Sequence, residues 1–316
     1  MGRYVTRRLL QAVLVLWAAY SLSFAVLYLL PGDPVEIMAA GGGEVTEVTD
    51  EQLDAVRAEY GLDAPLAEQY LDRLGAALTG DLGTSVQTGE RVTAMITEQL
   101  PATLRLTLAA GVLALLLGSA VALAGAHTRR PWLRQTLLSL PSVGASAPTF
   151  WVGLLLIQLV SFRWGLLPAI GDQGFESLVL PALTLALPTS AVLAQVFAKS
   201  LRDALREPYV ETALAKGASR SRVTLRHAAR NASLPAFTVL GVLVGNLLAG
   251  SVVVETVFSR TGVGRITATS VTVQDIPVVQ GLVVLGAVAF VLANLAVDLV
   301  YPLLDPRVTT GGAVAR

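Results

Sequence analysis

The chain has 316 residues, of which 53% are hydrophobic and only 15% are charged, and its formal net charge at pH 7 is zero. Soluble domains carry about 25% charged residues, so this composition indicates a membrane protein. The sequence contains no Cys and only two His residues, His127 and His227, which lie in separate basic stretches, so neither a disulfide nor a bound metal or other cofactor is expected.

Six segments without Asp, Glu, Lys or Arg are long enough to cross a bilayer as helices, which takes about 20 apolar residues. They cover residues 9–30, 106–126, 135–162, 178–198, 232–254 and 276–297. Two prolines in the third segment, Pro141 and Pro148, and two in the fourth, Pro181 and Pro188, predict kinks. The sequence therefore predicts an all-α, polytopic membrane protein with six transmembrane helices.

The first apolar segment admits a second interpretation, a secretory signal peptide within residues 1–40. A basic start, an apolar run and small residues near Ala39 and Ala40 would fit that interpretation. However, signal peptides have apolar cores of about 7–15 residues, whereas this run is roughly 22 residues long. The sequence therefore favours a first membrane span.

Basic residues alternate between the connections of these spans, and the alternation predicts the orientation of the chain. The connection 199–233 contains eight Lys and Arg residues against three acidic ones, whereas the connection 31–100 contains fourteen acidic residues and three Arg. Arginines also precede the first span and follow the second. Because loops rich in Lys and Arg stay in the cytoplasm, both termini and the 199–233 loop are expected there.

The long connection at 31–100 is expected to form a small helical extracytoplasmic insertion. Thr49 and Gln52 have the spacing of a capping box, which predicts a helix after them. Pro65 can open a second helix, followed by a turn at 80–83. The insertion could be a solvated connector or a docking surface for a soluble protein that delivers substrate, and the sequence leaves both interpretations open.

The segment from Glu207 to Ser219 predicts a short helix in the basic loop. Pro208 suits the first turn of a helix, and Gly217 can adopt the left-handed conformation that ends one. Apolar residues recur at i, i+3, i+4 and i+7 and form one narrow face of small side chains: Val210, Ala213, Leu214 and Gly217. Because a partner can approach such a face closely, we expect this helix to dock into a groove of a second protein.

A second helix is expected to follow, capped by Ser219 or Ser221. Arg222, Arg226 and Arg230 would then share one cytoplasmic basic face. The favoured interpretation of these arginines is a helix lying on anionic lipid, and contact with a protein partner is the alternative.

The same loop carries a recognisable pattern. Glu211-Thr212-Ala213, followed by Gly217 and later by Leu234-Pro235, resembles the cytoplasmic EAA loop of ABC importer permeases. In that family the loop forms a coupling helix that seats in a cleft of the ATPase subunit. The resemblance therefore implies an ATPase-coupling helix that comprises Val210, Glu211, Thr212, Ala213, Leu214 and Gly217. Thr212 departs from the Ala that the general pattern has at its second position.

Further fragments, spread over nearly the whole chain, resemble the B-type permease of dipeptide, oligopeptide, nickel and glutathione importers. Each fragment is weak alone, but their order and spacing together are specific. They include Leu29-Leu30-Pro31-Gly32-Asp33-Pro34, Gly80-Asp81-Leu82-Gly83-Thr84-Ser85, Leu100-Pro101-Ala102-Thr103-Leu104, Glu255-Thr256-Val257-Phe258, Asp275-Ile276-Pro277 and Leu304-Asp305-Pro306-Arg307.

The resemblance implies the fold of an ABC type I importer permease in the inner membrane of a prokaryote. Residues 1–30 would hold the N-terminal end and first span, 31–100 the outer subdomain, 101–305 the permease core with the other five spans, and 306–316 a cytoplasmic tail. Expected partners are a second, homologous permease in a heterodimer, two ABC ATPase domains, an extracytoplasmic substrate-binding protein and membrane lipid, without nucleic acid. Peptides, nickel, glutathione and other small solutes remain open as substrates.

The sequence lacks the motifs of a catalytic subunit. Its only lysines, Lys199 and Lys216, do not follow a Gly-x-x-x-x-Gly pattern, so the chain has no P-loop and is not expected to be an enzyme. Ion-coupled secondary transport is an alternative function, but such carriers often place charged relays inside the membrane, which the cores of these spans lack. A non-transporting assembly subunit is another alternative, and it would not need a docking helix.

Few polar side chains are expected at membrane depth. Glu255, Asn246 and Gln195 are the candidates for lining the pathway or forming a gate. Glu255 could equally cap the outer end of the fifth span, and side-chain amides in spans more often join helices than contact substrate.

Overall fold

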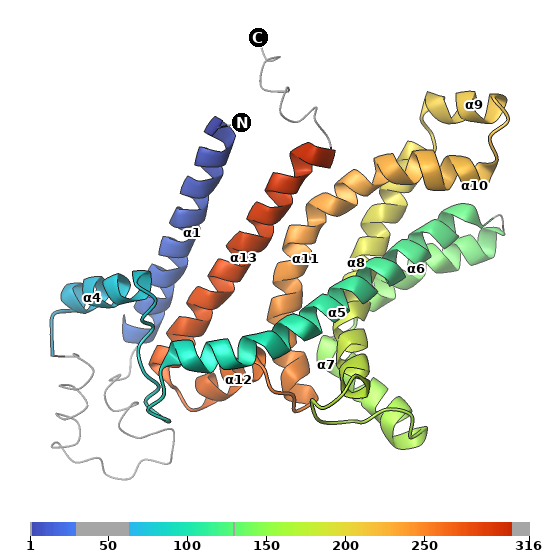
Figure 1. Cartoon of the computed structure of the whole chain (residues 1–316). Coiled ribbons are helices and arrows are strands. Elements are labelled where there is room, and N and C mark those ends of the chain that lie inside the picture. Colours follow the sequence, from blue (N-terminus) through green and yellow to red (C-terminus); the bar gives the residue numbers. More distant parts are fainter. Residues whose placement is uncertain (1, 30–62, 129, 305–316) are drawn as a thin grey trace. The chain divides into compact units, whose positions relative to one another are not determined.

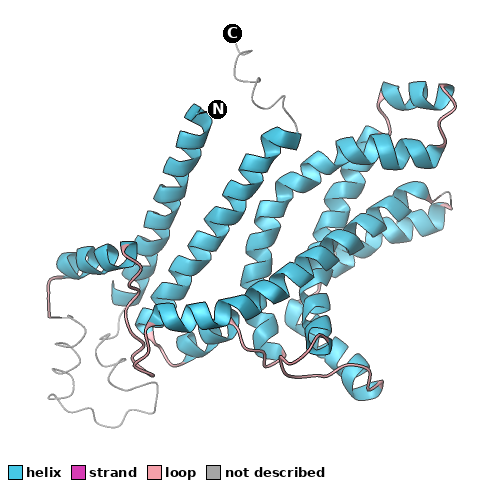
Figure 2. Cartoon of the chain, viewed as in Figure 1, coloured by secondary structure: helices cyan, strands magenta, loops and turns pink. Residues whose placement is uncertain are grey.

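The computed structural model describes residues 2–29, 63–128 and 130–304 of the chain (Figure 1). Figure 2 shows that the regular structure in these ranges is helical, and one isolated bridge pairs Thr84 with Arg91. The prediction of an all-α protein is therefore confirmed. The chain divides into two compact units, Met1–Thr103 with Thr261–Val291 and Leu104–Arg260 with Leu292–Arg316.

The first unit contains α1 (Gly2–Leu29), α4 (Leu66–Leu78), α12 (Val263–Thr272) and the first parts of α5 (Val92–His127) and α13 (Ile276–Leu304). Phe24 of α1 and Ile276 of α13 form a small buried cluster against which Tyr70 of α4 packs. The Tyr70 ring meets Phe24 edge-on with 5.4 Å between centroids, and its hydroxyl lies 2.7 Å from Ser21 Oγ. These contacts fix α4 against α1.

The helix α4 is the one predicted to begin near Pro65. Pro65 occupies the N-cap position, one residue earlier than a first-turn proline, and the helix ends at Leu78. In the following turn Asp81 Oδ1 accepts a hydrogen bond from the Gly83 N–H at 2.9 Å. The predicted capping box of Thr49, with the helix expected after it, lies outside the described residues.

A buried polar contact joins the segment after this turn to the start of α13. Ser85 Oγ donates to Asp275 Oδ2 at 2.5 Å, and both side chains are almost fully buried. The Val86 N–H also reaches Asp275 Oδ1, at 3.4 Å. Loss of one partner would leave a buried polar group unpaired, at a cost of about 1–3 kcal/mol.

The second unit is built around α8 (Glu176–Ala204). Its other apolar helices are the later part of α5, α6 (Pro131–Ser146), α7 (Thr149–Leu156) with the π-helical η1 (Ile157–Arg163), and α11 (Ala229–Val257). In the most apolar 18-residue stretch of α8, 67% of the residues are buried, whereas in the corresponding stretch of α5 only 33% are buried. Figure 1 shows α11 beside α8, and α6, α7 and α11 all contact it, so α8 is the central helix of this unit.

Two glycines let neighbouring helices approach α8 closely. A Cβ added at Gly118 of α5 would lie 2.8 Å from the backbone oxygen of Ser190, and one added at Gly250 of α11 would lie 2.7 Å from Leu185 Cδ1. Both distances are shorter than the ~3.5 Å at which carbon atoms begin to make favourable contact. Small residues at such crossings permit the close packing that joins helices within a membrane.

The segment 135–162, which the sequence predicts as one kinked span, contains a sharp bend between two helices. The helix α6 meets α7 and η1 at an angle of 103°. The chain leaves the helical conformation at Ala147 (φ −76°, ψ 127°), and Pro148 occupies the N-cap of α7. Proline disfavours helical dihedral angles in the residue before it, which explains why the helix breaks at this point. Pro181 and Pro188, by contrast, lie within the continuous helix α8.

By length and hydropathy alone, four helices in the described residues could cross a membrane: α1, α5, α8 and α13. The bent arrangement of α6 with α7 and η1 would add a fifth crossing if it counts as one span. The remaining predicted segment, 232–254, lies within α11, where Val242–Val257 forms a shorter apolar stretch. Each predicted segment thus coincides, over its described residues, with helical structure apart from the break before Pro148.

The connection between α8 and α11 is itself helical. It contains α9 (Pro208–Ala215), α10 (Arg220–Arg222) and the π-helical η2 (Val223–Ala228), which continues directly into α11. Val223 and Ala228 of η2 are almost fully buried, and Ala228 packs in a cluster with Leu201 of α8 and Ala232 of α11. These contacts fix the connection to the end of α8.

Replacement of Gly118 by Leu is expected to destabilise the second unit. The new side chain would meet the Ser190 carbonyl oxygen, which cannot move without displacing α8, and overpacking typically costs about 1–3 kcal/mol. The thermal unfolding midpoint of the purified protein in detergent should therefore fall. Gly286→Leu is the control, because nothing lies within 4 Å of a Cβ at that helical glycine. An equal loss of stability in both variants would contradict the role of the close crossing.

Candidate functional site

The helix α9 forms where the sequence predicts it, and local signals fix both of its ends. Glu207 is extended and Pro208 occupies the first helical position. At the other end Gly217 has a left-handed φ of +84°. The Ala218 N–H then donates to the Ala213 carbonyl oxygen at 3.1 Å, and the Gly217 N–H donates to the Leu214 carbonyl oxygen at 2.9 Å. This pattern is a Schellman motif, which satisfies carbonyl groups left free at the end of a helix.

The predicted apolar face of α9 is divided between the interior and the surface. Val210 is only 8% exposed and therefore anchors the helix to the rest of its unit. Leu214 is 38% exposed, Ala213 is half-buried, and Gly217 is exposed. Glu211 and Thr212 are exposed as well. The surface open to a partner is therefore smaller than the four-residue face expected from the spacing, because Val210 already packs within the chain.

The second helix of the loop begins as predicted and then departs from the predicted geometry. Ser219 Oγ accepts a hydrogen bond from the Arg222 N–H at 3.3 Å, so Ser219, not Ser221, is the cap. The following residues form the π-helical η2, whose wider turn changes the angular spacing assumed for a regular α-helix. Arg222, Arg226 and Arg230 are all exposed.

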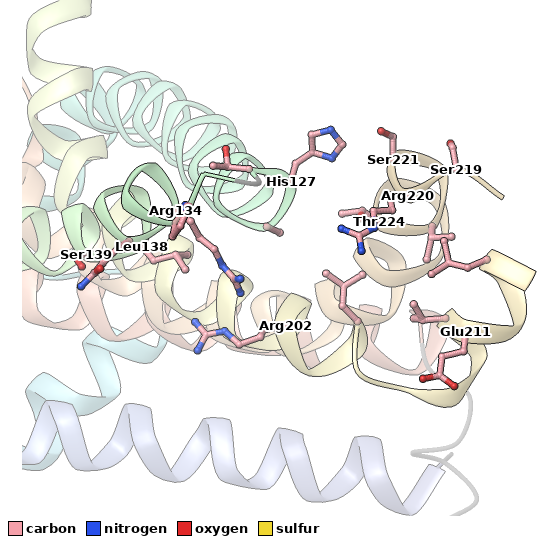
Figure 3. Close-up of a pocket in the computed structure, with 18 residues that line it drawn as sticks. His127, Arg134, Leu138, Ser139, Arg202, Glu211, Ser219, Arg220, Ser221 and Thr224 are labelled. Atoms are coloured by element: carbon pink, nitrogen blue, oxygen red, sulfur yellow. The ribbon is translucent and has the colours of Figure 1, made fainter. Parts of the chain in front are cut away.

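A cavity of about 1360 Å³ lies between this loop and the ends of neighbouring helices (Figure 3). Its walls come from the end of α5, the first half of α6, the last turn of α8, and α9, α10 and η2. Figure 3 shows Arg134, Arg202 and Arg220 around it, together with His127 and Glu211. Three guanidinium groups against one carboxylate give the cavity an excess of positive charge.

The structure brings only some of the predicted loop residues to this cavity. Among the described residues that line it are Val210, Glu211 and Leu214 of α9. The lining also includes Arg134 and Arg202, which belong to the basic connections that predict the orientation of the chain. Their positions beside the ends of apolar segments were a signal that they belong to one end of the molecule, but nothing in the sequence indicated that a cavity joins them.

The three candidates for the pathway do not form one site. Glu255 of α11 is 1% exposed. Asn246 is exposed on the same helix, and nine residues separate the two side chains by roughly 14 Å along the helix axis. Gln195 of α8 lines a separate small cavity between α6 and α8. The structure therefore distinguishes a buried carboxylate from two amides in different surroundings.

Arg260 is a buried residue that the sequence analysis missed. It is 6% exposed and follows the Glu255-Thr256-Val257-Phe258 fragment by two positions. One of its guanidinium nitrogens, Nη1, donates to the carbonyl oxygens of Gly171 and Ser177 at 3.0 and 2.9 Å. Burial lowers the pKa of Arg260 from its ordinary value, while the nearby carboxylates of Asp172 and Glu255 act to raise it. Arg260 thus fixes the loop before α8 to the end of α11.

Comparison with known sequences identifies the family. The family described as binding-protein-dependent transport system inner membrane component matches residues 114–310, and its N-terminal counterpart matches residues 1–107. The chain belongs to this family. The two matches cover almost the whole sequence, including α9 and the helices on either side of it.

Individual relatives agree over the full length. The glutathione transport system permease protein GsiC of Salmonella choleraesuis (strain SC-B67) is 37% identical over 308 residues, covering 98% of this chain and 99% of the relative. GsiC of Escherichia coli (strain K12) is 36% identical with the same coverage. Among solved structures, the MetNI methionine ABC transporter in an inward-facing conformation shares the fold, with a TM-score of 0.51, 16% identity, and coverage of 66% of this chain and 96% of that chain.

Family membership decides among the functions that the sequence left open. The protein is a multi-pass inner-membrane permease subunit of an ABC importer, rather than an ion-coupled carrier or an assembly subunit. Its partners include an ATPase and a substrate-binding protein, and ATP is hydrolysed by the ATPase partner, not by this non-catalytic chain.

Replacement of Arg260 by Gln is expected to loosen the loop before α8. A shorter neutral side chain would remove this donor from the part-buried Gly171 carbonyl oxygen and from the buried Ser177 carbonyl oxygen, and an unpaired buried acceptor costs about 1–3 kcal/mol. Hydrogen exchange of the amides in 165–177 should accelerate, and the unfolding midpoint should fall. Arg163→Gln, which removes an exposed arginine near the same loop, is the control. Unchanged exchange in the Arg260 variant would contradict the proposed fixing of the loop.

Proposed function

We propose that α9 is the element through which the ATPase partner drives this permease. The observation that carries the proposal is the construction of the helix: Pro208 and the Schellman motif at Gly217 fix its ends, and Val210 anchors it. A short helix held in this way moves as one body. When a partner moves, α9 can therefore move with it and displace the flanking helices, because α9 itself does not unwind.

The contact with the ATPase would use the exposed part of α9. Leu214 and Ala213 supply small apolar contacts, Gly217 allows close approach at the end of the helix, and Glu211 and Thr212 offer polar groups. Val210 acts from within, because its burial keeps the helix in place when a load is applied. The Glu211-Thr212-Ala213 pattern with Gly217 supports this assignment, since it resembles the coupling loop of importer permeases.

The movement would reach the membrane through α8 and α11. The helix α9 follows α8 after a short connection, and η2 continues directly into α11. We propose that closure of the ATPases on ATP displaces α9 and turns the pathway from inward-facing to outward-facing. Release of the hydrolysis products would reverse the displacement and release substrate into the cell.

The pathway itself would be shared with a second, homologous permease in a heterodimer. Residues 101–305 would form the permease core, with the coupling loop at 199–233, and the 31–100 subdomain would face the substrate-binding protein outside the cytoplasm. The buried Glu255 is the preferred gate residue of the three candidates, because it is almost fully buried beside the charged Arg260, and a buried charge pair is rarely kept for stability alone. Asn246 and Gln195 remain weaker candidates.

The substrate is proposed to be a small peptide or a peptide-like solute such as glutathione. Relatives with 36–37% identity over nearly the whole chain are glutathione permeases. The soluble binding protein would supply most of the selectivity, so the permease need not bind substrate tightly. Competition between labelled glutathione and dipeptides for uptake by the assembled importer would distinguish these substrates.

Changes on α9 are expected to weaken binding of the ATPase and, with it, substrate uptake. Gly217→Leu would put a side chain on a residue whose φ is +84° and would fill the space that the ATPase needs at the end of α9. Glu211→Lys would reverse an exposed charge. Each variant should lower ATPase copurification and substrate uptake by at least about tenfold, the effect of losing about 1.4 kcal/mol of interface free energy. Both quantities are measured on the importer purified from cells that express all subunits.

The control for backbone strain is Gly165→Leu, because Gly165 also has a left-handed φ, +63°, with nothing within 4 Å of its Cβ. It lies outside the loop and should leave ATPase copurification unchanged. Normal uptake and ATPase binding in both α9 variants would overturn the assignment of the coupling helix.

The orientation of the chain can be tested with single cysteines, because the natural sequence contains none. Ala215 at the end of α9 and Thr79 after α4 are both exposed. In intact cells an impermeant maleimide should label Thr79→Cys and spare Ala215→Cys, and permeabilisation should make both reactive. Labelling of Ala215→Cys in intact cells would contradict a cytoplasmic position for α9.

A further inference from the structure

The basic cavity beside α9 lies at the ends of three apolar helices. The helix α5 ends at His127, α6 begins at Pro131, and α8 ends at Ala204, and residues at or next to all three ends line the cavity. Next to Pro131, the Trp132 side chain is 63% exposed. Tryptophan is enriched where membrane helices meet the lipid headgroups. Helix ends next to an exposed tryptophan are typical of the depth where a membrane meets water.

A second cavity adjoins the first and extends along the helices. It has a volume of about 160 Å³ and shares Leu138 and Arg202 with the basic cavity. Its remaining lining residues are mostly apolar: Val121, Leu137, Pro141, Ala194, Gln195 and Ala198. Arg202 thus separates a large, positively charged space from a narrow, mostly apolar one.

We propose that these two cavities together bind one anionic phospholipid. The phosphate would lie among Arg134, Arg202 and Arg220, where charge-assisted hydrogen bonds to phosphate oxygens are strong. The first methylene groups of one acyl chain would enter the apolar cavity past Leu138. The rest of the chain would extend from this cavity towards the interior of the bilayer.

The paired cavities favour a lipid over the other anionic ligands that three arginines could attract. A free phosphate would use the basic cavity but not its apolar extension. An acidic peptide from a soluble partner would need no space directed along the helices towards the membrane interior. Basic pockets between membrane helices are known to receive phospholipid headgroups, and the arrangement of charge next to apolar space matches that chemistry.

A lipid in this place would connect the loop to the membrane helices. It would contact α6 and α8 through its phosphate and would fill the space below Val210 and Leu214 of α9, which line the same cavity. The inference goes beyond the proposed coupling role and does not depend on it, because the lipid site is defined by α5, α6 and α8 as well as by the loop.

The test is lipid retention by the assembled importer, measured by native mass spectrometry during titration with phosphatidylglycerol or phosphatidylcholine. The wild-type complex should bind one phosphatidylglycerol with preference over phosphatidylcholine. In the double variant Arg134→Gln/Arg202→Gln, the affinity for phosphatidylglycerol should fall at least about tenfold, since each arginine near a lipid surface contributes about 1 kcal/mol. The weaker affinity for phosphatidylcholine should stay unchanged.

Two further variants keep the result interpretable. Arg206→Gln removes an exposed arginine four residues after Arg202 that does not line the cavity, and it should bind phosphatidylglycerol normally. Arg134→Lys/Arg202→Lys keeps both charges and should retain most of the affinity. If the Gln pair fails to assemble, the Lys pair still tests the site, because loss of the preference for phosphatidylglycerol in an assembled Lys pair would contradict recognition by charge.

Four outcomes would overturn the proposal. Equal binding of both lipids by the wild-type complex, or unchanged phosphatidylglycerol affinity in the Gln pair, would exclude a headgroup site. Displacement of the lipid by millimolar glycerol 3-phosphate would indicate a site for a soluble phosphate. Loss of the ATPase from the Gln pair with unchanged lipid retention would assign the cavity to an acidic surface of the protein partner.

Discussion

The second unit of this permease depends on how closely its helices approach α8. Inside a membrane the hydrophobic effect does not join helices, because lipid is as apolar as their side chains, so close packing must do so. Gly118 and Gly250 provide that packing from two sides, and α8 is buried as a result. The consequence for function is mechanical: a central helix held by several neighbours cannot shift alone, so a displacement at its end must involve the helices around it.

The loop after α8 meets this central helix with an equally well-defined structure. The ends of α9 are determined by residues within the loop, whereas its attachment is determined by Val210 and by the burial of η2 against α8 and α11. The helix is therefore specified locally and positioned by tertiary contacts. The family relies on a separate ATPase, and under the coupling role proposed above this construction would let α9 receive the displacement of that partner as one body.

Local signals in the sequence predicted the elements better than their packing. Pro208, Gly217 and Ser219 act through their own backbone and neighbouring N–H groups, so the helices they bound could be predicted from the sequence. The break at Ala147 was underestimated because a proline in an apolar run can either kink a helix or end it, and tertiary context decides. The burial of Val210, the π-helical turn of η2 and the acceptors of Arg260 depend on residues distant in sequence, which spacing along one segment cannot reveal.

The sharp bend before Pro148 has a consequence for the surroundings of the chain. Where α6 stops and α7 starts, carbonyl and N–H groups lose their helical partners within an apolar stretch, and hydrocarbon cannot supply replacements. The bend of 103° therefore needs polar partners for its backbone that lipid cannot provide. Side chains, water or adjacent helices can supply them, so this part of the subunit has to be shielded from pure hydrocarbon.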